Sequence, residues 1–209
     1  NVVIATYLGQ KHDSAVRRSV STVAIVSVAS GVLLLLAGTL LARPILEAMS
    51  APPDVIDLAA QYLRIYFCGM PFIMIYNFGS AILRSVGDTK LPFYSLLVAT
   101  VCNMLLDWLF VAVFGMGVDG VAWATVIANA LNAAIIVWFL TREPEPVTLS
   151  LKRWSMSVPD FRKMLQIGIP AGLQGMVFSF SNIFIQSAIN KFGADAIAGS
   201  AAALTYEAY

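Results

Sequence analysis

Asp107 is a carboxylate within a run of otherwise apolar residues, VCNMLLDWLF at 101–110. Asn103 precedes it by four residues, which places the two side chains one turn apart on the same face of a helix. A short connection follows, so the next apolar segment is expected to be an antiparallel neighbour with Thr125 at a similar depth. Carboxylate, amide and hydroxyl oxygens suit a hard cation such as Na⁺, whereas a proton needs only the carboxylate. We therefore predict a cation-binding site at Asp107, Asn103 and Thr125.

The composition indicates a membrane protein. Of the 209 residues, 59% are hydrophobic and 12% charged, whereas soluble domains have about 45–50% apolar and about 25% charged residues. A net charge of +1 without a basic run argues against nucleic-acid binding. Cys68 and Cys102 lie in apolar runs, and the one histidine, His12, lies in a polar segment. We predict no enzyme activity, no cofactor, and no metal other than Na⁺ at Asp107.

Five apolar stretches, and the start of a sixth, are long enough to cross a bilayer, which takes about 20 residues of helix. They cover residues 19–42, 58–83, 91–114, 118–140, 162–190 and 195–209. A glycine-rich turn, FGMGVDG, joins the third and fourth, and SVPD at 157–160 predicts a helix start near residue 158. The predicted fold class is an all-α membrane protein, a polytopic helical bundle.

The distribution of Lys and Arg predicts the orientation, because loops retained in the cytoplasm are enriched in these residues. Ten of the 13 fall on one predicted side of the membrane. We predict that residues 1–18, 84–90 and 141–161 are cytoplasmic loops. The last is the only long polar stretch, so it is interpreted as a linker between two bundles, residues 1–140 and 162–209.

The intramembrane polar residues also have structural interpretations. Arg64 lies near the outer end of its own span, at roughly the same depth as Asp107, so the two could form a structural ion pair. Intramembrane acids more often mark an ion or proton pathway. Asn103 and Thr125 alone would be weaker indicators, because such side chains commonly join membrane helices by hydrogen bonds.

A polar face also follows the segment 162–190, where polar side chains and one aromatic recur every four residues. They are Gln174, Phe178, Asn182 and Gln186. Exposing such a face to lipid costs free energy, so it lines either a helix interface or a water-filled cavity. We take the four as candidates for a substrate cavity, with the interface as the alternative. Pro170 in this segment and Pro71 in the second span are candidate flexing points.

Longer stretches resemble one known family. They include ILRSVGDTKLP, GVDGVAWATVIAN and IGIPAGLQGMVFSFSNIFIQSAINKFGADAIAG. These resemble the multidrug and toxic compound extrusion (MATE) family, and the resemblance covers essentially the whole chain. It implies a two-lobe fold of twelve transmembrane helices, of which this chain would hold about helices three to eight. The sequence does not begin with Met and stops within a helical segment, so we expect an internal piece of a longer protein.

The resemblance also implies roles for individual residues. In the DinF-like branch of the family, a cation site uses an Asp on helix one, an Asn and an Asp on helix five, and a Thr on helix six. Asn103, Asp107 and Thr125 match the last three, and the first would precede residue 1. Other members carry an acid on helix seven, near the place where this chain has Phe178.

The implied function is secondary active export from the inner (plasma) membrane. A small organic molecule, expected to be cationic and amphipathic, would leave in exchange for inward H⁺ or Na⁺, and no obligate protein partner is expected. Two alternatives stand beside it. One is a flippase or exporter of a lipid-linked or metabolic substrate, and the other is a non-transporting structural membrane subunit in which Asp107 pairs with Arg64.

Overall fold

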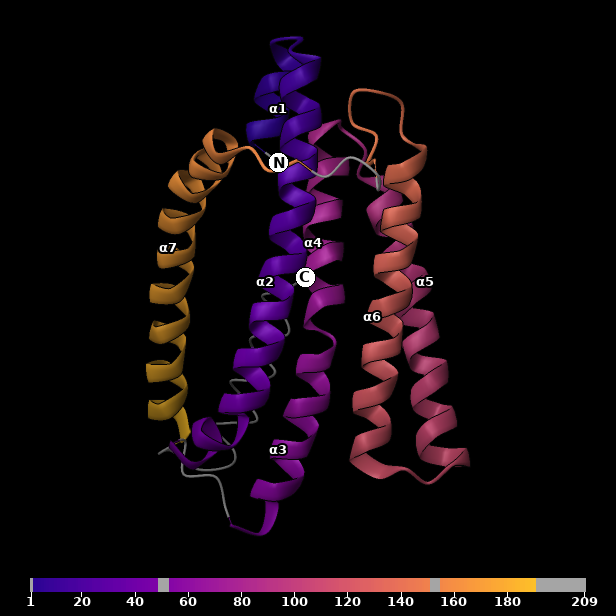
Figure 1. Cartoon of the computed structure of the whole chain (residues 1–209). Coiled ribbons are helices and arrows are strands. Elements are labelled where there is room, and N and C mark those ends of the chain that lie inside the picture. Colours follow the sequence, from indigo (N-terminus) through magenta and orange to yellow (C-terminus); the bar gives the residue numbers. More distant parts are fainter. Residues whose placement is uncertain (1, 49–52, 151–154, 191–209) are drawn as a thin grey trace. The chain divides into compact units, whose positions relative to one another are not determined.

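The computed structural model describes residues 2–48, 53–150 and 155–190, with the backbone alone at 48, 53–55 and 183–190. All regular elements in these ranges are helical (Figure 1). They are α1 (Val2–Gly9), α2 (Asp13–Ala48), α3 (Pro53–Cys68), α4 (Met70–Ser85), α5 (Lys90–Trp108), the π-helical segment η1 (Leu109–Val113), α6 (Gly117–Arg142) and α7 (Val158–Asn190). The prediction of an all-α protein is confirmed for this part of the chain.

The chain divides into two compact units, residues 1–161 and 162–209. The first holds α1 to α6, the segment after α6 and the first turn of α7. The second holds the remainder of α7. The predicted division into lobes at 1–140 and 162–209, with a linker at 141–161, stays a prediction.

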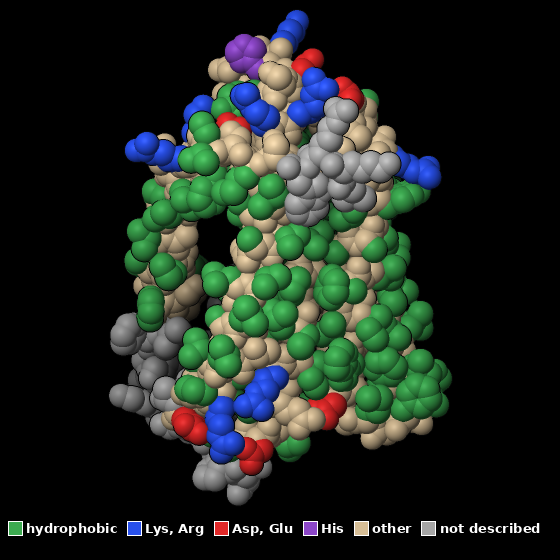
Figure 2. Space-filling model, in the orientation of Figure 1, with side chains coloured by type: hydrophobic (Ala, Val, Ile, Leu, Met, Phe, Trp, Pro, Cys, Tyr) green, Lys and Arg blue, Asp and Glu red, His purple; other side chains and the backbone are tan. Residues whose placement is uncertain are grey.

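Within the first unit, α2 packs against both α3 and α4, and α6 packs against α3, α4 and α5 (Figure 1). The helices alternate in direction, so the start of α2, the end of α4, the start of α5 and the end of α6 lie at one end of the unit. At that end lie most of the unit's Lys and Arg side chains (Figure 2). Within the first unit, the helix directions thus bring together the described basic residues that the sequence placed on one side of the membrane, which are Lys11, Arg17, Arg18, Arg84, Lys90 and Arg142.

Three described helices are long and apolar enough to cross a membrane, at 13–47, 90–113 and 117–142. Taken together as one broken span, α3 and α4 would make a fourth crossing, and the two are bent by 43° at a break around Gly69. The predicted second span, 58–83, is therefore two helices and not one. A span within 162–190 stays a prediction, and the predicted span 195–209 lies outside the described residues.

The prediction of a loop over residues 1–18 was wrong. Residues 2–9 form α1, and α2 begins at Asp13, six residues before the predicted span. The polar residues at 10–18 suggested a loop, but Ile4 and Val16 are buried, so these turns pack against the bundle. At its other end α2 continues beyond residue 42, where Arg43 pairs with Glu47 at 3.0 Å, one turn later.

The turn between η1 and α6 is the predicted glycine-rich connection. Gly115 and Gly117 have φ of 65° and 58°, a left-handed conformation that side chains with a Cβ disfavour. The turn before α5 is closed differently. Asp88 accepts hydrogen bonds from the amides of Lys90 and Leu91 at 2.9 and 3.0 Å, which satisfies two of the unpaired amides at that helix start.

Small residues allow the helices of the first unit to approach closely. A Cβ at Gly31 of α2 would lie 2.5 Å from Cα of Pro71 in α4, and one at Gly79 of α4 would lie 2.3 Å from Ile136 of α6. Interfaces of this kind are typical of membrane helices, whose association depends on close packing and not on the hydrophobic effect. Outward, α5 presents large apolar side chains such as Phe93, Met104 and Trp108 (Figure 2).

Candidate functional site

Asp107 is the penultimate residue of α5, which is followed directly by η1. There the amide of Phe114 donates to the carbonyl of Leu109 at 3.0 Å, five residues back instead of four. A single π turn inside a helix disturbs the regular ladder and frequently accompanies a functional site. The carboxylate is therefore attached next to the one irregular turn of the α5 span.

The polar side of α5 carries two unpartnered atoms. Oδ1 of Asp107 and Nδ2 of Asn103 are buried and have no hydrogen-bond partner among the described residues. Met104, Leu105 and Trp108, on the rest of the helix surface, are exposed. A polar atom without water or a partner costs free energy in a bilayer, so the Asp107–Asn103 face requires a ligand, water or another polar group.

Thr125 lies on α6, the helix that packs against α5. Its side chain is half-buried between the buried residues Ala124 and Val126, and its hydroxyl donates to the carbonyl of Val121 at 3.0 Å. The hydroxyl oxygen keeps lone pairs that can accept or bind a cation. No hydrogen bond links Thr125 to Asp107 or Asn103 in the described chain, so the structure brings the three onto one pair of packed helices without joining them.

Arg64 is not the counter-ion of Asp107 in this structure. Its side chain is exposed on α3, and its backbone carbonyl accepts a weak hydrogen bond from Sγ of Cys68. Ion pairs between described residues include Arg17–Glu145, Arg43–Glu47 and Arg43–Asp57. The ion pair between Asp107 and Arg64, which was the alternative interpretation of Asp107, is thus not formed in this structure.

The candidates for a substrate cavity lie in the second unit. Gln174 and Phe178 border a shallow open groove on α7, and Phe178 is 69% exposed. Asn182 is also exposed, and the side chain of Gln186 lies outside the described residues. A substrate role for these four residues stays a prediction.

The structure adds a polar residue that the sequence analysis did not single out. Asn132 on α6 is 2% exposed, and its Oδ1 has no hydrogen-bond partner among the described residues. It follows Thr125 by seven residues, two turns along the same helix face. This spacing is visible in the sequence, but an Asn without a nearby acid is more simply interpreted as a residue that joins membrane helices by hydrogen bonds.

The first 109 residues, just over half the chain, match the family model described as MatE. The chain belongs to the MatE family. This confirms the family that the sequence resembled, and with the apolar helices it makes the chain part of a multi-pass protein of the inner (plasma) membrane. Membership in the DinF-like branch stays a prediction.

Two relatives of this MatE chain are proteins of Bacillus subtilis (strain 168). It is 32% identical over 205 residues to the probable multidrug resistance protein YoeA, covering 95% of the chain and 44% of YoeA. It is 36% identical over 166 residues to the probable multidrug resistance protein YpnP, covering 78% and 36% respectively. The chain therefore spans less than half the length of these relatives.

Solved structures support the MatE fold. A MOP superfamily transporter from Pyrococcus furiosus superimposes with a TM-score of 0.88 at 24% identity, over 98% of this chain and 46% of the transporter. At this identity the likeness concerns the fold alone. It confirms the prediction of a partial MATE-type bundle.

Proposed function

We propose that the protein containing this MatE chain is a secondary active exporter that couples outward movement of a small organic molecule to inward movement of H⁺ or Na⁺. The observation that carries this proposal is the buried Oδ1 of Asp107, which has no hydrogen bond among the described residues. An intramembrane acid of this kind is typical of ion and proton pathways. The names of the relatives YoeA and YpnP support a multidrug substrate class.

Asp107 is the coupling residue in this proposal. A proton would neutralise its carboxylate directly, whereas Na⁺ would need further oxygens, for which the amide of Asn103 and the hydroxyl of Thr125 are available on α5 and α6. Coupling requires that the ion bind one conformation better than the other, because a ligand with equal affinity for both shifts neither. The π turn beside Asp107 is a local element that such binding could rearrange.

The substrate is proposed to be cationic and amphipathic. Once the ion has left, the Asp107 carboxylate carries a negative charge in a medium of low dielectric constant, where it attracts an organic cation strongly. Substrate and driving ion then compete for one charge, which is a sufficient basis for exchange. No obligate protein partner and no enzymatic step are part of this proposal.

The test is transport of ethidium by the full-length protein in proteoliposomes, with an H⁺ gradient and a Na⁺ gradient imposed separately. Wild type should transport ethidium under one gradient, which identifies the ion. Asp107→Asn should reduce transport to the rate of protein-free liposomes, because an amide neither binds nor releases a proton and is a poorer Na⁺ ligand. Thermal unfolding in detergent shows whether the variant is folded.

Asp119→Asn is the matched control. Asp119 is in the first turn of α6, and its Oδ2 accepts a hydrogen bond from Nε2 of Gln61 at 2.6 Å, whereas its Oδ1, like that of Asp107, is buried without a partner among the described residues. This variant makes the same chemical change in the same helix pair and should transport like wild type. Equal transport by wild type and Asp107→Asn would refute the coupling role. No ethidium transport by wild type under either gradient would favour a flippase or metabolite exporter.

A further inference from the structure

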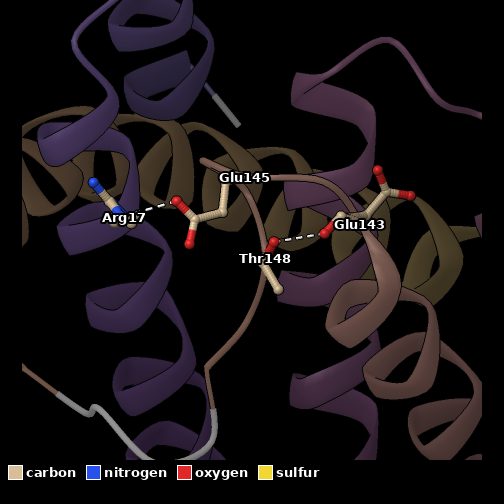
Figure 3. A network of polar contacts seen from close by, with 4 residues as sticks. All are labelled: Arg17, Glu143, Glu145 and Thr148. Atoms are coloured by element: carbon tan, nitrogen blue, oxygen red, sulfur yellow. Dashed lines mark hydrogen bonds and ion pairs between the residues drawn. The ribbon is translucent and has the colours of Figure 1, made fainter.

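The segment after α6 folds back onto the first turns of α2. Oε2 of Glu145 lies 2.9 Å from Nη1 of Arg17, and the amide of Ser155 donates to Oγ of Ser21 at 2.8 Å. The hydroxyl of Thr148 donates to the carbonyl of Glu143 at 2.5 Å, which closes the turn that carries Glu145 (Figure 3). Side chains far apart in sequence are therefore fixed around one place at the end of the unit.

Between the segment and α2 lies a cleft of about 520 Å³. Its polar lining consists of Arg17, Arg18, Ser21, Glu145, Thr148, Ser150 and Ser155. It combines two guanidinium groups with hydroxyl groups. Guanidinium groups bind phosphate oxygens in pairs, and hydroxyl groups donate to the same acceptors.

The charges of the cleft are not balanced. Arg17 is paired with Glu145, but their side chains are 53% and 72% exposed, so water weakens this ion pair. Arg18 has no ion pair among the described residues. The cleft thus has a net charge of +1, from Arg17, Arg18 and Glu145. An incoming anion can also bind Arg17 if it displaces Glu145.

An apolar cavity of about 170 Å³ lies one to two turns deeper along α2. Val23, Ala24 and Val28 of α2 line it, opposite Phe78 and Ile82 of α4 and Val137 of α6. Leu149 borders both the cavity and the polar cleft, so the two are neighbours. A basic cleft next to an apolar cavity matches a ligand with an anionic head and a hydrocarbon chain better than it matches free phosphate.

We infer that this site binds an anionic phospholipid, with its phosphate between Arg17 and Arg18 and an acyl chain running past Leu149. Basic pockets between membrane helices at the cytoplasmic surface bind such headgroups, and each Lys or Arg near the surface contributes about a fivefold gain in affinity. Glu145 is an internal competitor for the phosphate. The site is at the opposite end of the first unit from Asp107 and is independent of the export proposal.

The test is binding of phosphatidylglycerol to the full-length protein in a neutral detergent, measured by native mass spectrometry. Arg18→Gln should weaken binding about fivefold, because it removes one surface cation. Glu145→Gln should tighten binding, because Arg17 is released from its partner. Opposite effects of two substitutions on one cleft are not expected from a general loss of folding.

Lys90→Gln is the control for surface charge. Lys90 is an exposed cation at the same end of the unit and lies outside the cleft. It should leave phosphatidylglycerol binding unchanged, and phosphatidylcholine should not compete. Equal weakening by Arg18→Gln and Lys90→Gln would overturn the site in favour of general attraction. Displacement of the lipid by inorganic phosphate at the same concentration as by phosphatidylglycerol would overturn the lipid and identify a phosphate site.

Discussion

Asp160 is a second buried carboxylate, and one of its two oxygens has a hydrogen bond of a kind that Asp107 lacks. It is 2% exposed, accepts a hydrogen bond from the hydroxyl of Tyr7 at 2.9 Å, and lies in the first turn of α7. A helix N-terminus has partial positive charge, which stabilises a carboxylate there. Oδ2 of Asp160, like Oδ1 of Asp107, has no hydrogen-bond partner among the described residues. Because its Oδ1 is bonded to Tyr7, we interpret Asp160 as an anchor of the α7 start.

We expect Tyr7→Phe to destabilise the first unit by about 1–3 kcal/mol, because the buried carboxylate of Asp160 loses its donor. Thermal unfolding of the full-length protein in detergent measures this effect. Tyr94→Phe removes a hydroxyl from an exposed tyrosine on α5 and is the control, with no expected change. Equal melting of Tyr7→Phe and wild type would show that the anchor contributes no stability.

Glu143 is expected to make stability depend on pH. Burial, and then repulsion from Asp88, raise the pKa of this carboxyl above its ordinary value of 4.5. Between 4.5 and the raised pKa the folded chain keeps a proton that the unfolded chain has released, so stability falls as pH rises through this window. Above the raised pKa, Glu143 is ionised in the folded chain, and its burial lowers the free energy of unfolding.

Glu143→Gln should therefore raise the melting temperature at neutral pH and leave it unchanged below pH 4.5, where both states are protonated. Melting curves of wild type and variant at the two pH values are the measurement. A gain of the same size at both would mean that shape, and not ionisation, limits stability at this position.

Among the elements, the break between α3 and α4 departs most from the sequence prediction. A continuous apolar run at 58–83 predicted one span, with Pro71 as a flexing point. In the structure Pro71 lies in the first turn of α4, where the missing N–H of proline costs no helical hydrogen bond. The helix axis bends at Gly69. The role of Pro71 as a flexing point stays a prediction. Hydropathy does not reveal the break, because both halves of the run are apolar.

We expect Gly31→Ala to destabilise the α2–α4 contact by about 1–3 kcal/mol, because the added methyl group would meet the backbone of Pro71 and not a movable side chain. Thermal unfolding again measures the change. Gly9→Ala is the matched control, since nothing lies within 4 Å of a Cβ there. An unchanged melting temperature for Gly31→Ala would mean that α2 and α4 can move apart without loss of stability.

For the molecule as a whole, local rules predicted what depends on neighbouring residues. Hydropathy predicted α2, α5 and α6 but not α1 or the break between α3 and α4. The glycines of FGMGVDG predicted a turn, and SVPD predicted a helix start near Val158. The spacing of Asn103 and Asp107 placed them on one helix face. The contact between Tyr7 and Asp160 joins residues 153 positions apart, and the cleft at Arg17 depends on where the segment after α6 docks. Such long-range contacts have no local signature.

The length of the α5 span, 24 residues to the end of η1, has a consequence for the surrounding lipids. At about 1.5 Å per residue it measures roughly 36 Å, against a hydrocarbon core of about 30 Å. The helix must tilt, or the bilayer must thicken around it, and short-chain and long-chain lipids favour different solutions. The distance from the Asp107 carboxylate to the nearer aqueous phase is thus set jointly by the protein and by the thickness of the membrane that holds it.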